Sequence, residues 1–251
     1  MIKIAVLGVG RMGREIIKQA VAEKFQVVAA LDSAKSGLLG KDAGILSGME
    51  PLNVPVEDSK NLAEILGRTK PDAVVDFTNA DACVRNSGVV CSKKINMVIG
   101  TTGFTEEQLT ELRSNIVKTN TGAVISPNMS VGVNVFWNLV RDAAKSLKDY
   151  EIEIVESHHK FKKDKPSGTA LKTAEIIAKE IGKKKDEIPI HAIRAGDIVG
   201  EHMVILATIG ERVEITHRAH SRMAFVNGVI KAVKFIYGKK GIYGMADVLS
   251  M

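Results

Sequence analysis

The chain has 251 residues, of which 45% are hydrophobic and 25% are charged, and this length predicts one or two domains. Such a composition excludes a disordered, collagen-like or low-complexity chain, and no apolar run approaches the ~18 residues of a membrane span. Lys and Arg exceed Asp and Glu by 35 − 29, or +6, which raises the question of anionic partners, although an aromatic content of 4% disfavours single-stranded nucleic acid.

Short apolar strands alternate with amphipathic helices in the first half of the chain. The start, Met1-Ile2-Lys3-Ile4, leads directly into a strand and lacks the layout of a signal peptide. Strands are predicted over residues 2–7, 26–31, 72–77, 97–101 and 123–126. Helices are predicted from Arg14 onward, around Leu62, Ile65 and Leu66, over residues 80–94, and after the capping-box sequence Thr105-Glu106-Glu107-Gln108. This alternation predicts a parallel sheet with right-handed crossovers.

The two cysteines, Cys83 and Cys91, lie eight residues apart within the predicted helix 80–94. Two cysteines in one helix cannot build a disulfide framework, so we expect buried thiols in a reducing compartment. Together with the missing signal-peptide layout, this predicts a soluble, cytoplasmic protein.

The pattern changes near Asn128. A helix is predicted over residues 131–147, and Glu151-Ile152-Glu153-Ile154-Val155-Glu156 then alternates charged and apolar residues like a half-exposed strand. Further elements are predicted as a helix over 169–181, strands over 188–194, 203–209 and 212–216, and a helix over 222–237. This region is therefore expected to be α+β with an open, mixed sheet, joined to the first region by a short hinge.

A glycine-rich turn follows the first strand. Gly8, Gly10 and Gly13 fit G-x-G-x-x-G between a strand and a helix, as in Rossmann-type dinucleotide-binding folds. The first glycine allows the tight turn, the second allows a pyrophosphate to approach the backbone, and the third allows close packing. The alternative is an ordinary tight turn.

Asp32 ends the second strand, 19 residues after Gly13. This is close to the expected position of the acidic residue that binds the ribose hydroxyls of a dinucleotide. Asp32 followed by Ser33 favours NADH, because a carboxylate repels the 2′-phosphate of NADPH. Arg11, Arg14 and Lys35 could compensate, so NADPH stays open.

Three further predicted strand ends carry small or polar residues, and the carboxyl ends of parallel strands are where ligands bind. These segments are Asp76-Phe77-Thr78-Asn79, Gly100-Thr101-Thr102-Gly103-Phe104 and Ser126-Pro127-Asn128-Met129. They could line a nicotinamide or a small substrate, or they could be simple turns.

The segment from Glu156 to Ala170 holds His158, His159 and four lysines, and ends in Pro166-Ser167-Gly168-Thr169 before a helix. No metal site is expected, because a neighbouring histidine pair without cysteine or carboxylate at ligand spacing rarely suffices. Two interpretations stay open on chemistry alone. One is a basic loop with exposed histidines; the other is an acid–base histidine, a lysine donor and a helix N-terminus that binds a carboxylate.

This segment resembles the E-x-H-H-x-x-K-x-D-x-P-S-G-T-A sequence of the dihydrodipicolinate reductase family. Further family motifs follow in order over nearly the whole chain: Gly10-Arg11-Met12-Gly13, Gly40-Lys41-Asp42-Ala43-Gly44, Asp76-Phe77-Thr78, residues 98–104, residues 128–134, residues 194–202 and Ser221-Arg222-Met223. One departure is that many members have G-x-x-G-R-M-G, whereas the first two glycines here are one residue closer.

The resemblance implies a fold and an assembly. Residues 1–129 and 223–251 would form the dinucleotide-binding domain, completed by the last helix. Residues 130–222 would form the substrate-binding domain, whose sheet would build a homotetramer.

The resemblance also implies a reaction: NAD(P)H-dependent reduction of 4-hydroxy-tetrahydrodipicolinate at C4 with loss of water, on the diaminopimelate route to lysine. The substrate is a small dicarboxylate, and neither nucleic acid nor a membrane is expected as a partner. The implied catalytic residues are His158 as general acid–base and Lys162 as proton donor. Substrate would be bound by His159, Gly168, Thr169 and Thr102, and cofactor by Gly8, Val9, Gly10, Arg11, Met12, Gly13, Asp32, Gly100, Thr101, Thr102, Ser126, Pro127, Asn128 and Met129.

Two alternative functions stay open: an enzyme with another substrate, and a protein that is not an enzyme. A different amine- or aldehyde-forming nicotinamide dehydrogenase would need another substrate segment in place of residues 158–169. A redox-sensing regulator would ordinarily add a DNA-reading helix-turn-helix or a basic arm, and neither is visible in the sequence.

Overall fold

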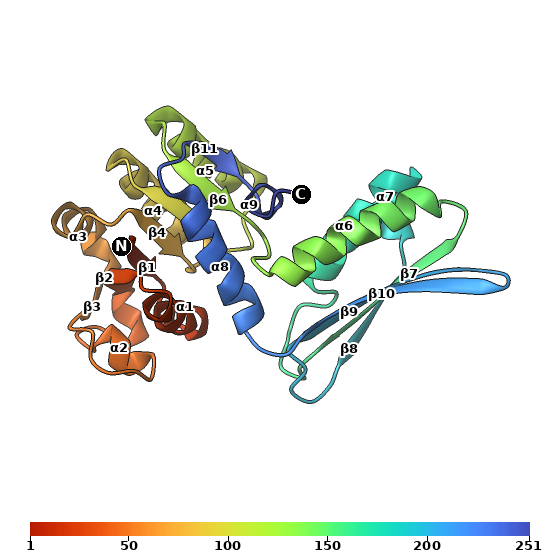
Figure 1. Ribbon diagram of the computed structural model, residues 1–251, viewed down its shortest axis with the longest axis horizontal. Helices are drawn as coiled ribbons and strands as arrows, with labels where there is room; N and C mark the ends of the chain where they lie inside the picture. The colour runs from red at the N-terminus through yellow and green to blue at the C-terminus, as the bar shows by residue number, and fades with distance from the viewer. The chain divides into compact units, whose positions relative to one another are not determined.

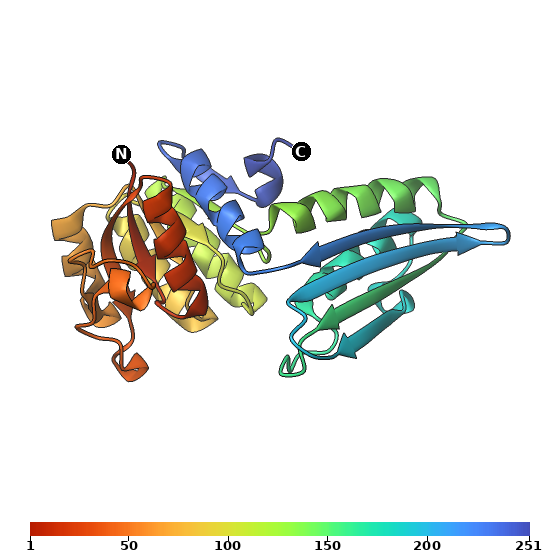
Figure 2. The same cartoon turned by 60° about the horizontal axis from the view of Figure 1, so that its bottom comes forward.

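The computed structural model describes all 251 residues, and the chain divides into two compact units. The first unit comprises residues 1–129 and 225–251, and the second comprises residues 130–224. Each unit is described by itself (Figures 1 and 2). No helix in either unit combines the length and the apolar character that crossing a membrane requires.

The first unit is built on a seven-stranded parallel sheet of order β11-β6-β5-β4-β1-β2-β3. The five inner strands confirm the predicted ones: β1 (Lys3–Leu7), β2 (Gln26–Asp32), β4 (Ala73–Asp76), β5 (Asn96–Ile99) and β6 (Gly122–Ile125). The edge strands β3 (Val56–Asp58) and β11 (Gly241–Tyr243) were not predicted. Three residues are too few to display a period, and their pairing is set by the neighbouring strand.

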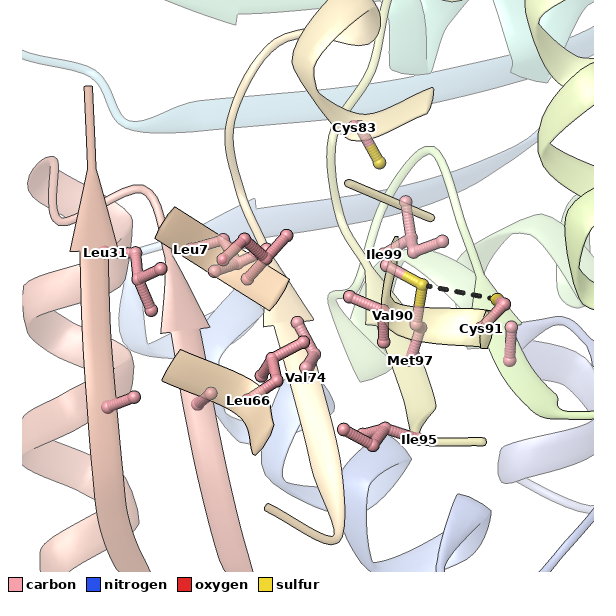
Figure 3. Packing of buried hydrophobic residues seen from close by; sticks show 14 of the residues in the cluster. Leu7, Leu31, Leu66, Val74, Cys83, Val90, Cys91, Ile95, Met97 and Ile99 are labelled. Atoms are coloured by element: carbon pink, nitrogen blue, oxygen red, sulfur yellow. Dashed lines mark hydrogen bonds between the residues drawn. The ribbon is translucent and has the colours of Figure 1, made fainter. Parts of the chain in front are cut away.

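Helices cover both faces of this sheet. They are α1 (Arg11–Ala22), α2 (Ala43–Leu46), α3 (Leu62–Thr69), α4 (Ala80–Ser92), α5 (Glu106–Thr119), α8 (Met223–Ile236) and α9 (Met245–Val248). Side chains of α3, α4 and α5 share one core cluster with alternate residues of the strands (Figure 3), while α1 and α8 lie against the opposite face (Figure 1). The Rossmann-type parallel-sheet prediction is therefore confirmed.

The start of α1 was predicted three residues too late. The helix begins at Arg11 and not at Arg14, because extended backbone at Gly10 ends the turn there. The capping box at the start of α5 is confirmed: the Thr105 hydroxyl accepts a hydrogen bond from the Gln108 N–H, and the Gln108 side chain accepts one from the Thr105 N–H.

Cys83 and Cys91 both lie in α4, and both are buried free thiols. Burial raises the pKa of each thiol. The Sγ of Cys91 lies 4.0 Å from the Sδ of Met97 on β5 (Figure 3), so it acts as a core side chain of the α4–sheet layer.

The second unit contains a four-stranded mixed sheet of order β10-β9-β7-β8, as expected. Its strands are β7 (Glu151–His158), β8 (Ile190–Arg194), β9 (Gly200–Thr208) and β10 (Glu211–Ala219). Only the β7–β8 pair is parallel. Three strands are longer than predicted: β7 extends to His158, β9 begins at Gly200, and β10 extends to Ala219. Their backbones continue to pair with the neighbouring strands beyond the residues that alternate between apolar and polar.

Two helices, α6 (Val131–Ser146) and α7 (Gly168–Ile181), pack on one face of this sheet. Their apolar side chains and the inward residues of β7 and β9 form one core cluster. The indole N–H of Trp137 on α6 donates a hydrogen bond of 3.0 Å to the Thr173 hydroxyl on α7, which satisfies the polar atom of a buried ring.

Candidate active site

The glycine turn of the first unit needs its first and third glycines for steric reasons. Gly8 has φ +90°, and a Cβ atom there would lie 2.5 Å from the carbonyl oxygen of Phe77. A Cβ atom on Gly13 would lie 2.0 Å from the carbonyl oxygen of Gly8. A Cβ atom on Gly10, by contrast, would meet nothing within 4 Å. The space above Gly10 is what a ligand's approach to the backbone requires.

The N-terminus of α1 has the character of an anion site. Gly10 caps the helix without a side chain, and the first turn contains no acidic residue. The amides of a helix N-terminus attract negative charge, and Arg11, on the surface, adds a positive charge. Arg14 is turned inward, where its Nε donates to the carbonyl oxygen of Val9 at 3.1 Å. These residues fit the pyrophosphate of a dinucleotide.

Asp32, at the end of β2, is joined to the glycine turn. Its carboxylate accepts hydrogen bonds from the N–H of Val9 at 2.8 Å and from its neighbour Ser33 at 2.7 Å. The side chain therefore fixes the shape of the turn. This contact between Asp32 and Val9 was not predicted from the sequence. It also places a negative charge at the carboxyl end of β2, where the ribose of a dinucleotide is bound in this fold.

The ends of β4 and β5 are held together by Asp76, which is fully buried. Its carboxylate accepts hydrogen bonds from the hydroxyl of Thr101 at 2.9 Å, from Thr78 and from Asn86. Gly100 lies against the ring of Phe77, and a Cβ atom on it would lie 2.1 Å from that ring. Asp76 thus orders the predicted Gly100–Thr102 segment, whose Thr102 is exposed.

The segment after β6 is also well ordered. The Ser126 hydroxyl donates to the carbonyl oxygen of Asn128 at 2.8 Å, and Met129 is buried. A Cβ atom on Gly228 of α8 would lie 1.6 Å from the carbonyl oxygen of Met129, so the helix packs directly on this backbone. The predicted segment 126–129 therefore sits at the same sheet edge as Gly100 and Thr101.

In the second unit, β7 presents Glu156 and His158 on the face that carries the core. The Glu156 side chain is fully buried, and Nδ1 of His158 lies 2.5 Å from a Glu156 carboxylate oxygen. Both terminal guanidinium nitrogens of Arg194, on the neighbouring β8, donate to the same carboxylate at 2.7 and 2.9 Å. Such a bidentate pair is among the stronger hydrogen-bonded arrangements in proteins.

These contacts set the protonation states. Burial alone would raise the pKa of Glu156, but hydrogen bonds from Arg194 and His158 hold it below its usual value. Burial lowers the pKa of His158, with Glu156 opposing the shift and Lys162 adding to it. At neutral pH the imidazole is therefore neutral and the carboxylate ionised, so Nδ1 carries the proton donated to Glu156 and Nε2 is available for proton exchange.

The basic loop after β7 and the start of α7 complete this group. Nζ of Lys162 forms an ion pair of 2.9 Å with Asp164, while Lys163 is exposed. The Ser167 hydroxyl accepts a hydrogen bond from the Ala170 N–H and so caps α7, whose first residues are Gly168 and Thr169. Nδ1 of His159 is buried without a hydrogen-bond partner.

His202, on β9, lies behind this group. Its Nε2 is 3.2 Å from the Ser167 hydroxyl, and its ring makes an edge contact with His158 at a centroid distance of 5.3 Å. Burial, together with the charge of His158, lowers the pKa of His202 to about 3. His202 is therefore neutral at physiological pH and acts as a support for the start of α7.

The predicted residues thus form two groups, one in each unit. The first unit brings Gly8–Gly13, Asp32, Gly100–Thr102 and Ser126–Met129 to the carboxyl edge of one sheet. The second unit brings His158, His159, Lys162, Gly168 and Thr169 to one end of β7 and α7. Residues that were given no role in the predicted site are Glu156, Arg194 and His202; of these, Glu156 could have been found, because it lies in phase with Ile152 and Ile154. Asp76 was predicted at a strand end, but not as the residue that joins β4 to β5.

Comparison with known families gives two matches that together span almost the whole chain. Residues 2–129 match the model described as "Dihydrodipicolinate reductase, N-terminus", and residues 132–249 match "Dihydrodipicolinate reductase, C-terminus".

Relatives agree with this result. A 4-hydroxy-tetrahydrodipicolinate reductase of Methanocaldococcus jannaschii is 49% identical, covering 100% of this chain and 98% of the relative. One of Methanothermobacter thermautotrophicus is 44% identical over 100% of both chains. Among solved structures, dipicolinate-bound dihydrodipicolinate reductase from Paenisporosarcina sp. TG-14 has a TM-score of 0.81 and 27% identity over 98% of both chains. The chain therefore belongs to the dihydrodipicolinate reductase family, the NAD(P)H-dependent oxidoreductases that reduce 4-hydroxy-tetrahydrodipicolinate on the diaminopimelate route to lysine.

Proposed function

We propose that His158 is the general acid–base residue of this reduction. The supporting observation is its buried contact with Glu156, which directs Nδ1–H to the carboxylate and leaves Nε2 to exchange a proton. Its lowered pKa keeps the imidazole neutral near pH 7, the state from which a histidine can both accept and return a proton.

Lys162 is the proposed proton donor. It is half-buried and held by Asp164, whereas the neighbouring Lys163 is exposed. An ammonium group carries the proton that a leaving hydroxyl needs to depart as water, and its charge attracts an anionic substrate.

The proposed substrate is a small dicarboxylate. Gly168 and Thr169 would bind one carboxylate at the N-terminus of α7, where helix amides favour negative charge, and His159 would bind the substrate beside it. The Nδ1 atom of His159 is buried without a hydrogen-bond partner, which suits a side chain that gains its missing hydrogen bond when a ligand binds. The Paenisporosarcina relative contains dipicolinate, which supports this substrate class.

The proposed cofactor site is the carboxyl edge of the parallel sheet. The open space at Gly10 and the α1 N-terminus would hold the pyrophosphate, and Asp32 would bind a ribose hydroxyl. Gly100 to Thr102 and Ser126 to Met129 would line the nicotinamide, with Thr102 also contacting substrate. When bound, the nicotinamide cofactor supplies the hydride. The charge of Asp32 favours NADH over NADPH.

We also propose a homotetramer in the cytoplasm. The second unit's sheet has helices on one face only, and its other face carries half-buried apolar residues such as Val155, Met203 and Ile205. A face of this kind suits an interface between copies. The buried free thiols of Cys83 and Cys91 suit a reducing compartment.

A steady-state assay tests the catalytic proposal. Freshly generated 4-hydroxy-tetrahydrodipicolinate is mixed with NADH or NADPH, and cofactor oxidation is followed by absorbance. We expect the wild-type chain to consume cofactor only with substrate, and His158→Gln to lower kcat by about 100-fold or more. A His158→Gln variant with wild-type kcat would remove His158 from this role.

A further inference from the structure

The buried Glu156 carboxylate joins three parts of the second unit. On β7 itself it lies against Nδ1 of His158, and it accepts hydrogen bonds from both terminal guanidinium nitrogens of Arg194 on β8. It also accepts a hydrogen bond of 3.1 Å from the backbone N–H of Ser167, the residue that caps α7. One side chain thus contacts the acid–base candidate and the residue before the carboxylate-binding helix end.

Arg194 extends this contact to the basic loop. One of its terminal nitrogens also donates to the carbonyl oxygen of Asp164 at 2.6 Å. The carboxylate of Asp164 in turn binds Nζ of Lys162. The Glu156–Arg194 pair is therefore connected to His158, to the Lys162 loop and to the start of α7 by direct contacts.

We propose that Glu156 and Arg194 are positioning residues for the reduction: their buried pair holds the His158 imidazole, the Lys162 loop and the α7 N-terminus in one fixed arrangement. The proposal rests on the proposed roles of His158 and Lys162. Neither positioning residue needs to touch the reacting atoms, because each acts through the groups that it holds.

Stability alone does not account for this pair. Burying two charges costs desolvation energy that their attraction often only balances, and well-packed apolar residues of similar size are frequently as stable. The apolar phase of β7, set by Ile152 and Ile154, would place an apolar residue at position 156 on this face. A carboxylate there gives four directed hydrogen bonds instead, and directed bonds fix geometry.

The pair also determines which nitrogen of His158 reacts. A carboxylate at Nδ1 keeps the proton there and exposes the Nε2 lone pair. A Cβ atom on Gly200 of β9 would lie 3.1 Å from Nε2, so a glycine is what leaves space at that atom. The other charged or titratable groups that face His158 are Arg194, Lys162 and His202.

Glu156→Gln is the first test variant, because it keeps the shape of the side chain and removes its charge. We expect kcat to fall about 100-fold, which is the scale of the loss when a catalytic group is displaced by ~1 Å. We also expect the limb of the kcat–pH profile that reports His158 to move to lower pH. Glu156 raises the pKa of His158, whereas Arg194 and Lys162, which remain, lower it.

Glu175→Gln is the matched control, since it removes the same charge from an exposed ion pair with Lys172 in the same unit. We expect its kcat and pH profile to equal those of the wild type. A Glu156→Gln variant with unchanged kcat and an unchanged pH limb would overturn the proposal.

A double variant separates positioning from folding. Glu156→Gln alone leaves the partly buried Arg194 without its anion and should lower Tm, whereas Glu156→Gln with Arg194→Met removes both charges and should recover most of that loss. We expect kcat of the double variant to stay at least 10-fold below wild type although it is folded. Recovery of kcat together with Tm would show a purely structural pair and overturn the proposal.

A double-mutant cycle of Glu156→Gln and His158→Gln distinguishes this proposal from the proposed role of His158. If Glu156 acts through His158, Glu156→Gln should lower kcat far less in a His158→Gln background than in the wild type. An equal fold-loss in both backgrounds would overturn the positioning role through His158. Wild-type kcat in His158→Gln alone would instead overturn the role of His158 itself.

Discussion

Gly13 lies so close to Gly8 that a Cβ atom on Gly13 would be 2.0 Å from the Gly8 carbonyl oxygen, inside any van der Waals contact. The first turn of α1 therefore packs directly on the backbone that ends β1. This contact fixes the direction in which the helix N-terminus points, and with it the place where an anion would bind. The glycines of the turn consequently have separable roles, two in packing and one at the open position Gly10.

The first prediction separates those roles with two alanine variants. Gly13→Ala forces the helix away from Gly8 and should destabilise the chain by ~1–3 kcal/mol, the cost of overpacking. Gly10→Ala has free space at its Cβ and a φ of −74°, so Tm should change little. The KM for the cofactor should rise, because the methyl group would occupy the space through which the pyrophosphate is proposed to approach. Thermal unfolding and steady-state kinetics measure the two effects. Equal loss of Tm in both variants would contradict this division.

The second prediction concerns the two adjacent lysines of the basic loop. Lys162→Ala should reduce kcat/KM by at least ~100-fold, because it removes the ammonium held by Asp164 beside the proposed substrate-binding residues. Lys163→Ala is the matched control, and as Lys163 is exposed it should keep kcat/KM within a few-fold of the wild type. If both variants lose the same factor, Lys162 is not the specific donor.

The third prediction concerns cofactor preference. Asp32→Asn keeps an oxygen that can accept the Val9 N–H bond and removes the charge that repels a 2′-phosphate. The ratio of kcat/KM for NADPH to that for NADH should rise roughly tenfold, which corresponds to ~1.4 kcal/mol. Asp72→Asn makes the same charge change before β4, at the opposite ends of the strands, and should leave the ratio unchanged. No change in the Asp32→Asn ratio would argue against its place at the ribose.

The fourth prediction concerns stability against pH. The pKa of His202 is lowered to about 3 in the folded protein from its ordinary value of 6.5. Between these two pH values, His202 therefore binds a proton in the unfolded chain but not in the folded chain. Protonation then favours unfolding. The free energy of unfolding should fall by up to about 1.4 kcal/mol per pH unit from this group between pH 6.5 and 3, and be fully retained above pH 6.5.

His202→Gln tests this, since an amide can still bind the Ser167 hydroxyl but does not titrate. Urea unfolding at several pH values should show a shallower pH slope for this variant. The exposed His191→Gln is the control and should keep the wild-type slope. An unchanged slope in His202→Gln would assign the acid sensitivity to other groups.

Some of the chain's basic residues are neutralised by ion pairs within the second unit. Lys162 forms an ion pair with Asp164, and Arg194 forms one with Glu156. Arg11 lies at the surface beside the α1 N-terminus. Each of these two ion pairs is neutral as a whole, so the net excess of positive charge lies on other basic residues, Arg11 among them.

Several features could be predicted from the sequence because they depend on local physics. The strand–helix alternation, the glycine turn and the capping box at Thr105 are properties of short windows, and all of them are present in the structure. The mixed character of the second sheet followed from the change of pattern near Asn128. The resemblance to the dihydrodipicolinate reductase family, and not local physics, singled out His158, Lys162, Gly168 and Thr169, which β7, its following loop and α7 bring to one end of the second unit.

Other features were decided by tertiary structure. The edge strands β3 and β11 exist because a neighbouring strand offers them hydrogen bonds, and three residues carry no period of their own. The Asp32 contact with Val9 and the Glu156–Arg194 pair join residues 23 and 38 positions apart, and nothing local to either residue encodes the partner. The sequence by itself determined which chemical groups the site contains. Only the folded sheet, which pairs β7 with β8 and buries Glu156, decided that Nδ1 of His158 donates its proton to that carboxylate and that Nε2 keeps its lone pair.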